Sequence, residues 1–217
     1  MNDRLMRTLL SPPSTSDAPG RIFGVVIGVV TNNQDPENLH RVKLRFPWLN
    51  NDHESHWARV VAPMAGNQRG AYFLPEVDDE ALVAFEHGSI EHPYVVGLLW
   101  NGKDAAPETN SGGDNNNRSI TSRSGHVIRL CDKQGDESIE IIDQTGNNRV
   151  VIRSSGNTIS IEAQGDISIK SSTGKVKIEG IGVEIKSSAG VTVQAQTTLD
   201  AQATGPVTIK GAMVRVN

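Results

Sequence analysis

The sequence has no aromatic residue after Trp100, only one cysteine, and no apolar run long enough to cross a bilayer. The lone Cys131 excludes an intrachain disulfide and a cysteine-built zinc site, and predicts a small buried or half-buried side chain. The N-terminal stretch MNDRLMRTLL is too short and too charged for a signal peptide or a membrane anchor. With a formal charge of −4 and no clustered basic face, the chain is not expected to bind nucleic acid.

The composition changes sharply near residue 100. Every Phe, Tyr and Trp lies at or before Trp100, and Pro206 is the only proline after Pro107. The stretch NGKDAAPETNSGGDNNN is polar, rich in Asn and Gly, and lacks apolar periodicity, which is typical of a linker or exposed loop. We therefore expect two architectures, with an N-terminal arm at 1–19, a first domain at 20–100, a polar linker at 101–117 and a second domain at 118–217.

The first domain is predicted to consist of short strands separated by turn residues. In residues 40–46, Val42, Leu44 and Phe46 alternate with three basic residues, so one face of that strand is apolar and the other charged. No segment shows a sustained helical period. About five strands with turn signals between them predict a small closed barrel such as the OB-fold. The expected strands are 21–31, 40–46, 56–64, 80–87 and 92–100.

Pairs of small aliphatic residues recur about every eight residues in the second domain. In all pairs but Val150/Ile152 one polar residue separates the two members, and turn formers such as Gly156, Gly165 and Gly174 lie between pairs. Residues i and i+2 point to nearly opposite faces of a helix but share one face of a strand. The repeat therefore predicts stacked β-structure. The pairs are Ile128/Leu130, Ile139/Ile141, Val150/Ile152, Ile159/Ile161, Ile167/Ile169, Val176/Ile178, Val183/Ile185, Val191/Val193, Leu199/Ala201, Val207/Ile209 and Val214/Val216.

One such strand has too little apolar surface to form a core alone, so other strands must cover it. A single-chain β-solenoid with about three segments per coil would do this. Three chains that each contribute one face of a triangular prism would do it as well. The uniform Val and Ile interior, without a longer three-segment period, favours the prism. The residues expected at its axis are Ile159, Ile161, Ile167, Ile169, Val176, Ile178, Val191, Val193, Val207 and Ile209.

Several sequence elements match a known family. They are Phe73-Leu74-Pro75-Glu76, Asp79-Glu80, Val83-Ala84-Phe85, Gly88, Pro93, Gly97, Asn101-Gly102, the upstream runs VKLRFPW and WARV, Ser124-Gly125-His126, and the ending GPVTIKGAMVRVN. With these elements the chain resembles VgrG proteins and the phage baseplate assembly protein V spikes. Asp78 stands where the family often has glycine, and aspartate tolerates the left-handed turn geometry.

The resemblance implies an all-β chain: an OB-fold barrel followed by an intertwined trimeric β-helix. It implies a homotrimeric spike that mounts on a separate hub, transmits contraction force and transiently contacts a target-cell envelope. Such a spike assembles in the bacterial cytoplasm and resides at the baseplate centre of a virion or injection particle. We expect neither a hub domain before the barrel nor an inserted lysozyme domain, and therefore a structural protein without cofactor rather than an enzyme.

Three sets of residues in the first domain carry side chains that could bind a ligand or take part in catalysis. Asp78, Asp79 and Glu80 form an acidic run that has no paired base, so we interpret it as a solvated turn. His53 and His56, beside Asp52 and Glu54, lack an evident third metal ligand and are read as a loop between strands. Trp48, Trp57 and Trp100 could stack on a sugar or base, but we expect them to fill the barrel or a trimer interface.

The aliphatic repeat continues to the last residues without a His-x-His pair, which some short spikes of this family use to hold iron at the tip. The resemblance implies that a separate PAAR-type tip protein docks there, through backbone pairing and apolar contact. A frayed, solvated end is the alternative. The expected docking residues are Met213, Val214, Arg215, Val216 and Asn217. The alternative for the whole chain is a β-solenoid adhesin or a polysaccharide-binding or hydrolysing module with an OB-fold.

Overall fold

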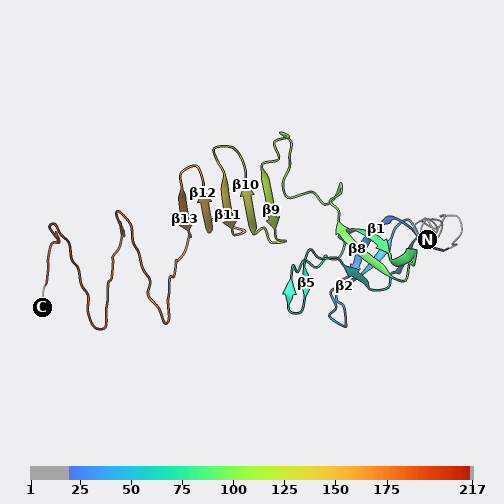
Figure 1. Cartoon of the computed structure of the whole chain (residues 1–217), viewed down its shortest axis with the longest axis horizontal. Coiled ribbons are helices and arrows are strands. Elements are labelled where there is room, and N and C mark those ends of the chain that lie inside the picture. The colour runs from blue at the N-terminus through green and yellow to red at the C-terminus, as the bar shows by residue number, and fades with distance from the viewer. Residues whose placement is uncertain (1–19, 216–217) are drawn as a thin grey trace, which may run out of the picture. The chain divides into compact units, whose positions relative to one another are not determined.

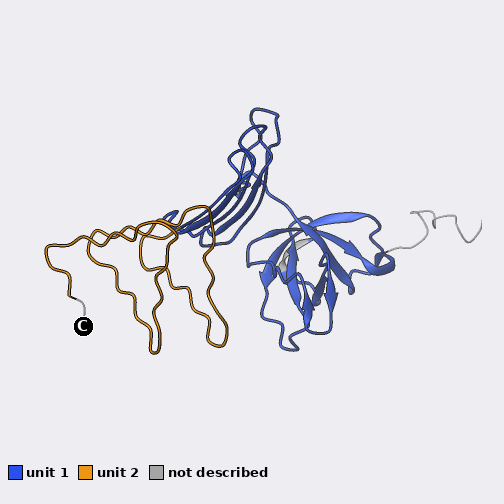
Figure 2. Ribbon diagram, turned by 60° about the vertical axis from the view of Figure 1, so that its left-hand side comes forward, with its two compact units in different colours: residues 1–161 blue, residues 162–217 orange. Residues whose placement is uncertain are grey.

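The computed structural model describes residues 20–215, except the side chains of residues 50–52, and these residues are all-β (Figure 1). They contain one short 3₁₀ turn, η1 (Glu86–Gly88), and no α-helix. No helix in this range is long and apolar enough to span a bilayer. The chain divides into two compact units, residues 1–161 and 162–217, which are described separately (Figure 2). The arm expected at 1–19 lies outside the described residues.

The first unit begins with a five-stranded barrel formed by β1 (Val25–Asn32), β2 (Arg41–Phe46), β4 (Ala58–Val60), β7 (Glu80–Phe85) and β8 (Pro93–Leu98). β1 pairs antiparallel with both β2 and β7, and the ring closes through β7–β8, the parallel pair β8–β4, and β4–β2. This closed order is that of an OB-fold. The predicted barrel and the positions of its five strands are confirmed.

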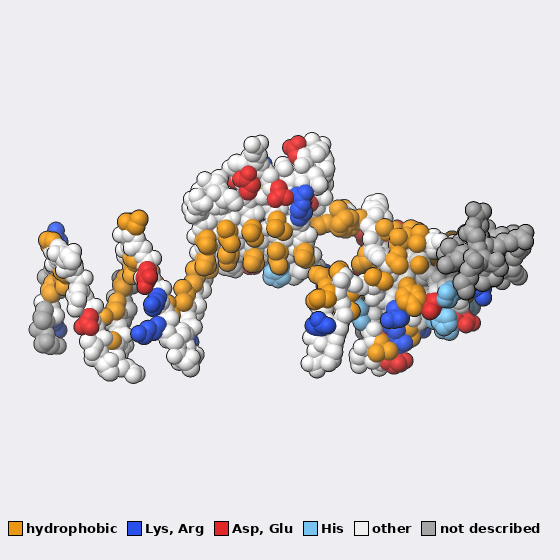
Figure 3. Space-filling view, in the orientation of Figure 1, with side chains coloured by type: hydrophobic (Ala, Val, Ile, Leu, Met, Phe, Trp, Pro, Cys, Tyr) orange, Lys and Arg blue, Asp and Glu red, His pale blue; other side chains and the backbone are white. Residues whose placement is uncertain are grey.

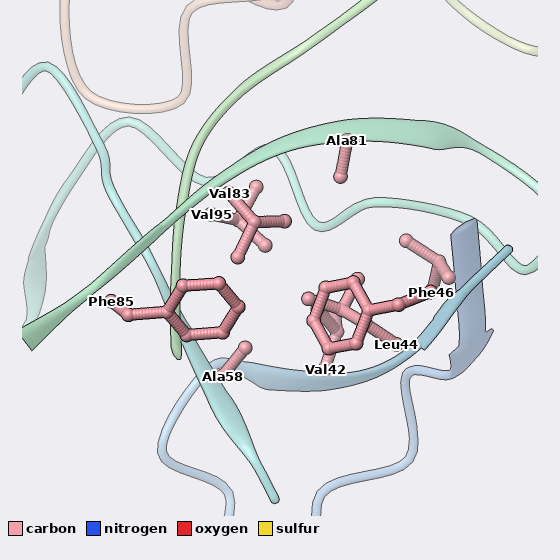
Figure 4. Close-up of a cluster of buried hydrophobic side chains, with 9 residues drawn as sticks. Val42, Leu44, Phe46, Ala58, Ala81, Val83, Phe85 and Val95 are labelled. Carbon is pink, nitrogen blue, oxygen red and sulfur yellow. The ribbon is translucent and has the colours of Figure 1, made fainter. Parts of the chain in front are cut away.

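The barrel core is built from alternate residues of each strand. In β2 and β7 every second side chain is buried, so Val42, Leu44 and Phe46 point inward and the basic residues between them point outward, as expected. Gly28 on β1 lies where a Cβ atom would come within 3.1 Å of the Phe46 ring, so glycine lets β1 approach the core. The core residues are Val30, Val42, Leu44, Phe46, Ala58, Ala81, Val83, Phe85 and Val95 (Figure 4).

Two expectations for the first domain are corrected. The segment read as a histidine-bearing loop contains strand β3 (Asn50–Glu54), which pairs with β2 beyond the barrel ring. The tryptophans do not fill the barrel: Trp48 is 47% exposed, Trp100 is 71% exposed, and Trp57 is half-buried outside the core. Alternating aliphatic residues and two phenylalanines already occupy this small interior. A short hairpin, β5 (Ala65–Gly66) with β6 (Arg69–Gly70), was not predicted.

A five-stranded antiparallel sheet follows the barrel: β9 (Asn117–Thr121), β10 (Val127–Cys131), β11 (Ser138–Ile142), β12 (Arg149–Arg153) and β13 (Thr158–Glu162). Each strand pairs with the next along the chain, in the order β9 to β13. Left-handed residues at the connecting turns, such as Gly125, Gly135 and Asn157, allow the tight reversals. The aliphatic pairs of these strands share one face, as the repeat predicted.

The second unit has no assigned strand within residues 163–215, but it keeps the predicted repeat. Bends occur at residues 164–165, 172–174, 180–181, 188–189, 196–197, 204–205 and 212. Extended chain connects the bends, and side chains here are exposed throughout the described part. An eight-residue repeat of extended segments and bends is therefore present, without strand pairing inside the single chain. The intertwined β-helix expected for 118–217 stays a prediction.

Candidate functional site

The candidate site is an exposed apolar surface on the sheet β9–β13. Register places Ile128 opposite Ile120 and Ile141, and Ile141 opposite Val150. A second row joins Leu130, Ile139 and Ile152. Figure 3 shows these rows as hydrophobic side chains lined up across the strands. We call this surface the aliphatic face; its residues are Ile120, Ile128, Leu130, Ile139, Ile141, Val150, Ile152, Ile159 and Ile161.

The aliphatic face is too exposed for a sheet that works alone. Ile128, Ile139 and Ile141 are 48%, 47% and 53% exposed, although they lie on inner strands. Full burial of one such side chain contributes about 1.5–3 kcal/mol. Contiguous apolar surface of this kind marks an interaction site. The face therefore provides association energy that the single chain does not use.

The residues predicted for a trimer axis in the second unit are likewise exposed. Their exposed fractions run from 53% at Ile167 and Val176 to 74% at Ile209. The structure thus places every predicted axis residue where further chains can reach it, and brings none of them into a core within the chain. The axis assignment stays a prediction for Ile159, Ile161, Ile167, Ile169, Val176, Ile178, Val191, Val193, Val207 and Ile209.

The residues predicted to dock a tip protein are only partly described. Met213 and Val214 are 71% and 51% exposed, and Arg215 is exposed, with its Nε 3.3 Å from the Met213 sulfur. Val216 and Asn217 lie outside the described residues. The docking assignment therefore stays a prediction, supported for Met213 and Val214 by their exposed apolar side chains.

The opposite face of the sheet, which we call the polar face, carries a row of charged residues. Arg129 on β10 lies between Ser119 on β9 and Glu140 on β11. Its Nε donates to Glu108 Oε1 at 2.9 Å, and its Nη1 donates to Glu140 Oε2 at 3.5 Å. The side chains of Glu108, Arg129 and Glu140 are 22%, 31% and 17% exposed.

The charge state of Glu108 follows from its contacts. Hydrogen bonds from Ser119, first, and from Arg129 hold the pKa of Glu108 below its usual value, despite the opposing effect of burial. The Glu108 ion pair raises the pKa of Arg129. Asn117 Nδ2 also donates to Glu108 Oε2 at 2.6 Å. Sequence reasoning missed this site, although Arg129 and Glu140 each stand between two aliphatic pair members.

The acidic run at the start of β7 has structural roles. Asp79 Oδ2 accepts a hydrogen bond from the Glu76 amide at 2.8 Å, and Glu80 Oε2 accepts one from Asn101 at 3.1 Å. Asp78 adopts φ 77°, the left-handed turn geometry predicted for it in place of glycine. Asp79 and Glu80 therefore help to hold a turn and the start of the segment after β8.

The structure also describes the histidine, cysteine and tryptophan residues that were candidates for metal or ligand binding. Among residues 20–215 no group of three His, Cys, Asp or Glu side chains is placed to hold a metal ion. His126, from the element Ser124-Gly125-His126, accepts a hydrogen bond at Nδ1 from the Gln144 amide. Cys131 is half-buried, as predicted. Arg41 Cζ and Lys43 Nζ lie over the Trp57 ring, 5.9 and 5.6 Å from its centroid. The face of this ring is therefore occupied by two cations of the same chain.

The β1–β2 loop, where OB-folds often bind ligands, is tied to its own strand. Asp35 accepts hydrogen bonds from Arg41 Nε and Nη2, both at 2.8 Å, and from the amides of Glu37 and Leu39. The guanidinium of Arg41, together with these amides, holds the pKa of Asp35 well below its usual range. These hydrogen bonds fix the conformation of the β1–β2 loop and use the polar groups of Asp35 within the chain.

Comparison with known proteins identifies the barrel. Residues 26–100 match the family described as the type VI secretion system/phage-baseplate injector OB domain. The match covers β1 to β8 and stops at Trp100, where the composition changes.

The chain is also similar to curated spike proteins. It is 26% identical over 145 residues to the type VI secretion system spike protein VgrG3 of Vibrio cholerae, covering 65% of this chain and 14% of that protein. It is 27% identical over 138 residues to VgrG1a of Pseudomonas aeruginosa, covering 58% of this chain and 22% of the relative. VgrG1c of the same organism is 29% identical over 132 residues, which cover 54% and 18%.

The chain thus spans less than a quarter of the length of these relatives. The family match, the closed barrel and the similarity to three spike proteins agree with the motifs read from the sequence. Residues 26–100 therefore form an injector OB domain, and the chain is similar to VgrG-type spike proteins over 54–65% of its length.

Proposed function

We propose that three copies of this chain form the central spike of a contractile injection machine. The observation that carries the proposal is the aliphatic face, whose rows are in register and exposed on inner strands. Three copies, each turning this face to a common axis, would bury it. Association of the copies would also cover the exposed aliphatic residues of the second unit.

The strand pairing supports a multi-chain prism over a single-chain solenoid. Sequential strands in β9–β13 pair antiparallel, whereas the coils of a β-solenoid stack their strands in parallel. Within residues 163–215 the described chain forms no strand, and extended backbone requires hydrogen-bond partners when it is buried. Association of several chains supplies both the apolar cover and the backbone partners.

In this proposal the spike is structural. It mounts on a separate hub at its OB-fold end, transmits the force of contraction, and makes transient contact with the target envelope. Met213 and Val214 contribute exposed apolar surface to a docking face for a PAAR-type tip protein. It needs no cofactor and has no catalytic role; it assembles in the bacterial cytoplasm and resides at the baseplate centre of a virion or injection particle.

The test of the assembly is the solution mass of the purified full chain. We expect a single species of three chains by native mass spectrometry and sedimentation velocity, with slow dissociation in detergent. A stable folded monomer would contradict the trimer and leave the β-solenoid module as the alternative.

The test of the tip is a pull-down with a PAAR-type protein encoded nearby. The full chain should retain that protein, and a chain truncated after Gly211 should lose it. Lys210→Gln serves as the control, because it changes an exposed side chain outside the docking residues. Equal binding by the truncated chain, or stoichiometric iron in the purified spike, would contradict the assigned tip.

A further inference from the structure

Both faces of the sheet β9–β13 carry aliphatic residues, so the sheet has two surfaces on which a second chain can pack. On the polar face, register aligns the half-buried Val127 with the half-buried Ile142 and places the buried Val151 opposite Glu140, so this face also has an apolar component. A correct spike requires every copy to use the aliphatic face. Something must therefore distinguish the faces before the copies meet.

The charged row on the polar face provides this distinction. We call Glu108, Arg129 and Glu140 the charged clasp. It links three separate pieces of the chain: the segment 105–116, strand β10 and strand β11. Ser138 Oγ donates to Glu140 Oε1 at 3.2 Å, so the second carboxylate is held as well.

The segment 105–116 is ordered around this contact rather than hanging free. Asn110 Oδ1 accepts from the Asn115 amide at 2.8 Å, which closes a loop. The Asn116 carbonyl accepts from the Asp132 amide at 2.8 Å, which extends the pairing of β9 with β10. These bonds place Glu108 beside β9. There it contacts both Ser119 on β9 and Arg129, which lies opposite Ser119 on β10.

A second copy packed on the polar face would have to displace Glu108. Arg129 and Glu140 would then be buried with fewer partners, and a buried charge that loses its partner is strongly destabilising. A copy packed on the aliphatic face displaces none of these three side chains, because Arg129 and Glu140 project from the other side of the strands and Glu108 contacts Arg129 there.

We propose that the charged clasp orients assembly: it reserves the polar face for the chain's own segment 105–116, so that further copies of this chain associate only through the aliphatic face. This inference rests on the proposed function, since it presupposes association through that face. The clasp determines which face of the sheet another copy can pack on. It does not contribute to the free energy of the contact between aliphatic faces.

The test compares Glu108→Gln with Asp136→Asn in the full chain. Asp136 pairs with Arg153 at 3.5 Å, and both side chains are about half exposed, so the control removes a carboxylate from an ion pair outside the clasp. Each protein is unfolded in denaturant and diluted. Sedimentation velocity gives the fraction that reaches the assembled state, light scattering gives aggregates, and hydrogen exchange reports on residues 109–116.

In Glu108→Gln we expect exchange in 109–116 to be about tenfold faster, as for the loss of one charged hydrogen bond. The assembled fraction should fall severalfold and aggregates should rise, while Asp136→Asn behaves as the wild type. Arg129→Lys keeps the charge but loses the forked contact, and should give an intermediate yield. Tryptophan fluorescence reports on the barrel alone, since all three tryptophans lie at or before Trp100, and should not change.

Three results would overturn the inference. The first is an assembled fraction for Glu108→Gln equal to that of Asp136→Asn. The second is faster hydrogen exchange in residues 109–116 with an unchanged assembled fraction. That result would mean that the clasp only orders its own segment and does not direct assembly. A wild-type chain that stays monomeric would contradict the proposed function as well, whereas the first two results leave that function intact.

Discussion

The barrel and the region after it use the same kind of residue in opposite ways. Leu44 and Val83 in the barrel are fully buried, whereas Ile169 and Val193 in the second unit are 73% and 64% exposed. Both regions alternate aliphatic and polar side chains along extended chain. The difference is closure: β1 pairs with both β2 and β7, so the barrel's inner face covers itself. The open sheet β9–β13 and the segments after it have no second layer within the described chain.

This contrast separates two sources of stability. The barrel obtains its core from one chain, so its stability is a property of that chain. The later region leaves its aliphatic residues exposed in the single chain, so under the proposed association its stability would depend on chain concentration. Changes in one region should therefore leave the other largely unaffected, apart from their covalent connection.

The largest effect is expected from a charge at the predicted axis. Ile169→Asp would bring carboxylates from several chains into an apolar column, which costs several kcal/mol for each charge. We expect loss of assembly by sedimentation velocity, with tryptophan fluorescence of the barrel unchanged. Lys170→Gln, the neighbouring exposed residue, should assemble normally. Equal assembly of the two variants would show that the predicted register is wrong.

A cavity in the barrel core should destabilise the barrel and leave assembly unchanged. Leu44→Ala removes a fully buried side chain and should lower the free energy of unfolding of the barrel by about 2–5 kcal/mol. Denaturant titration followed by tryptophan fluorescence measures this change. Val61→Ala is the control, because Val61 is 58% exposed and should change stability by less than about 0.5 kcal/mol. Loss of assembly in Leu44→Ala under native conditions would contradict the independence of the two regions.

Acid should loosen the charged clasp before it affects the aliphatic face. The pKa of Glu108 is lower in the folded chain than in the unfolded chain, so its contribution is present above its ordinary pKa of about 4.3 and is lost as pH falls through the folded value. Protection of residues 109–116 against hydrogen exchange, corrected for intrinsic rates, should be flat near neutrality and decline in acid. Glu108→Gln should lack this decline; a decline of equal size there would assign it to another group.

The smallest effect is expected at the acidic turn of the barrel. Asp79→Asn weakens one charge-assisted hydrogen bond to the Glu76 amide and should lower stability by about 1 kcal/mol. We expect no glycan cleavage by either the wild type or this variant, assayed by release of reducing ends from peptidoglycan. Reproducible cleavage by the wild type that Asp79→Asn abolishes would identify a catalytic site and overturn the structural role.

Much of the site could be predicted because strand alternation is local. Placing Ile139 and Ile141 on one face needs only the two-residue period of a strand, and the repeat of bends needs only its turn formers. The clasp could not be predicted, because Glu108 lies in a polar segment without periodicity and only the fold brings it to Arg129. The tryptophans could not be assigned between the barrel and a trimer interface, because composition does not reveal how much space a closed barrel leaves; the structure excludes the barrel interior.

The sequence by itself determined the all-β class, the change of architecture near residue 100, the inward face of β2 and the eight-residue repeat. These features depend on which side chains are apolar and on the short-range geometry of extended chain. Only the tertiary structure decided that β8 pairs parallel with β4 to close the barrel, and that Glu108 returns to the polar face. Such pairings join distant residues, and their free energy depends on the packing of the whole domain rather than on any local pattern.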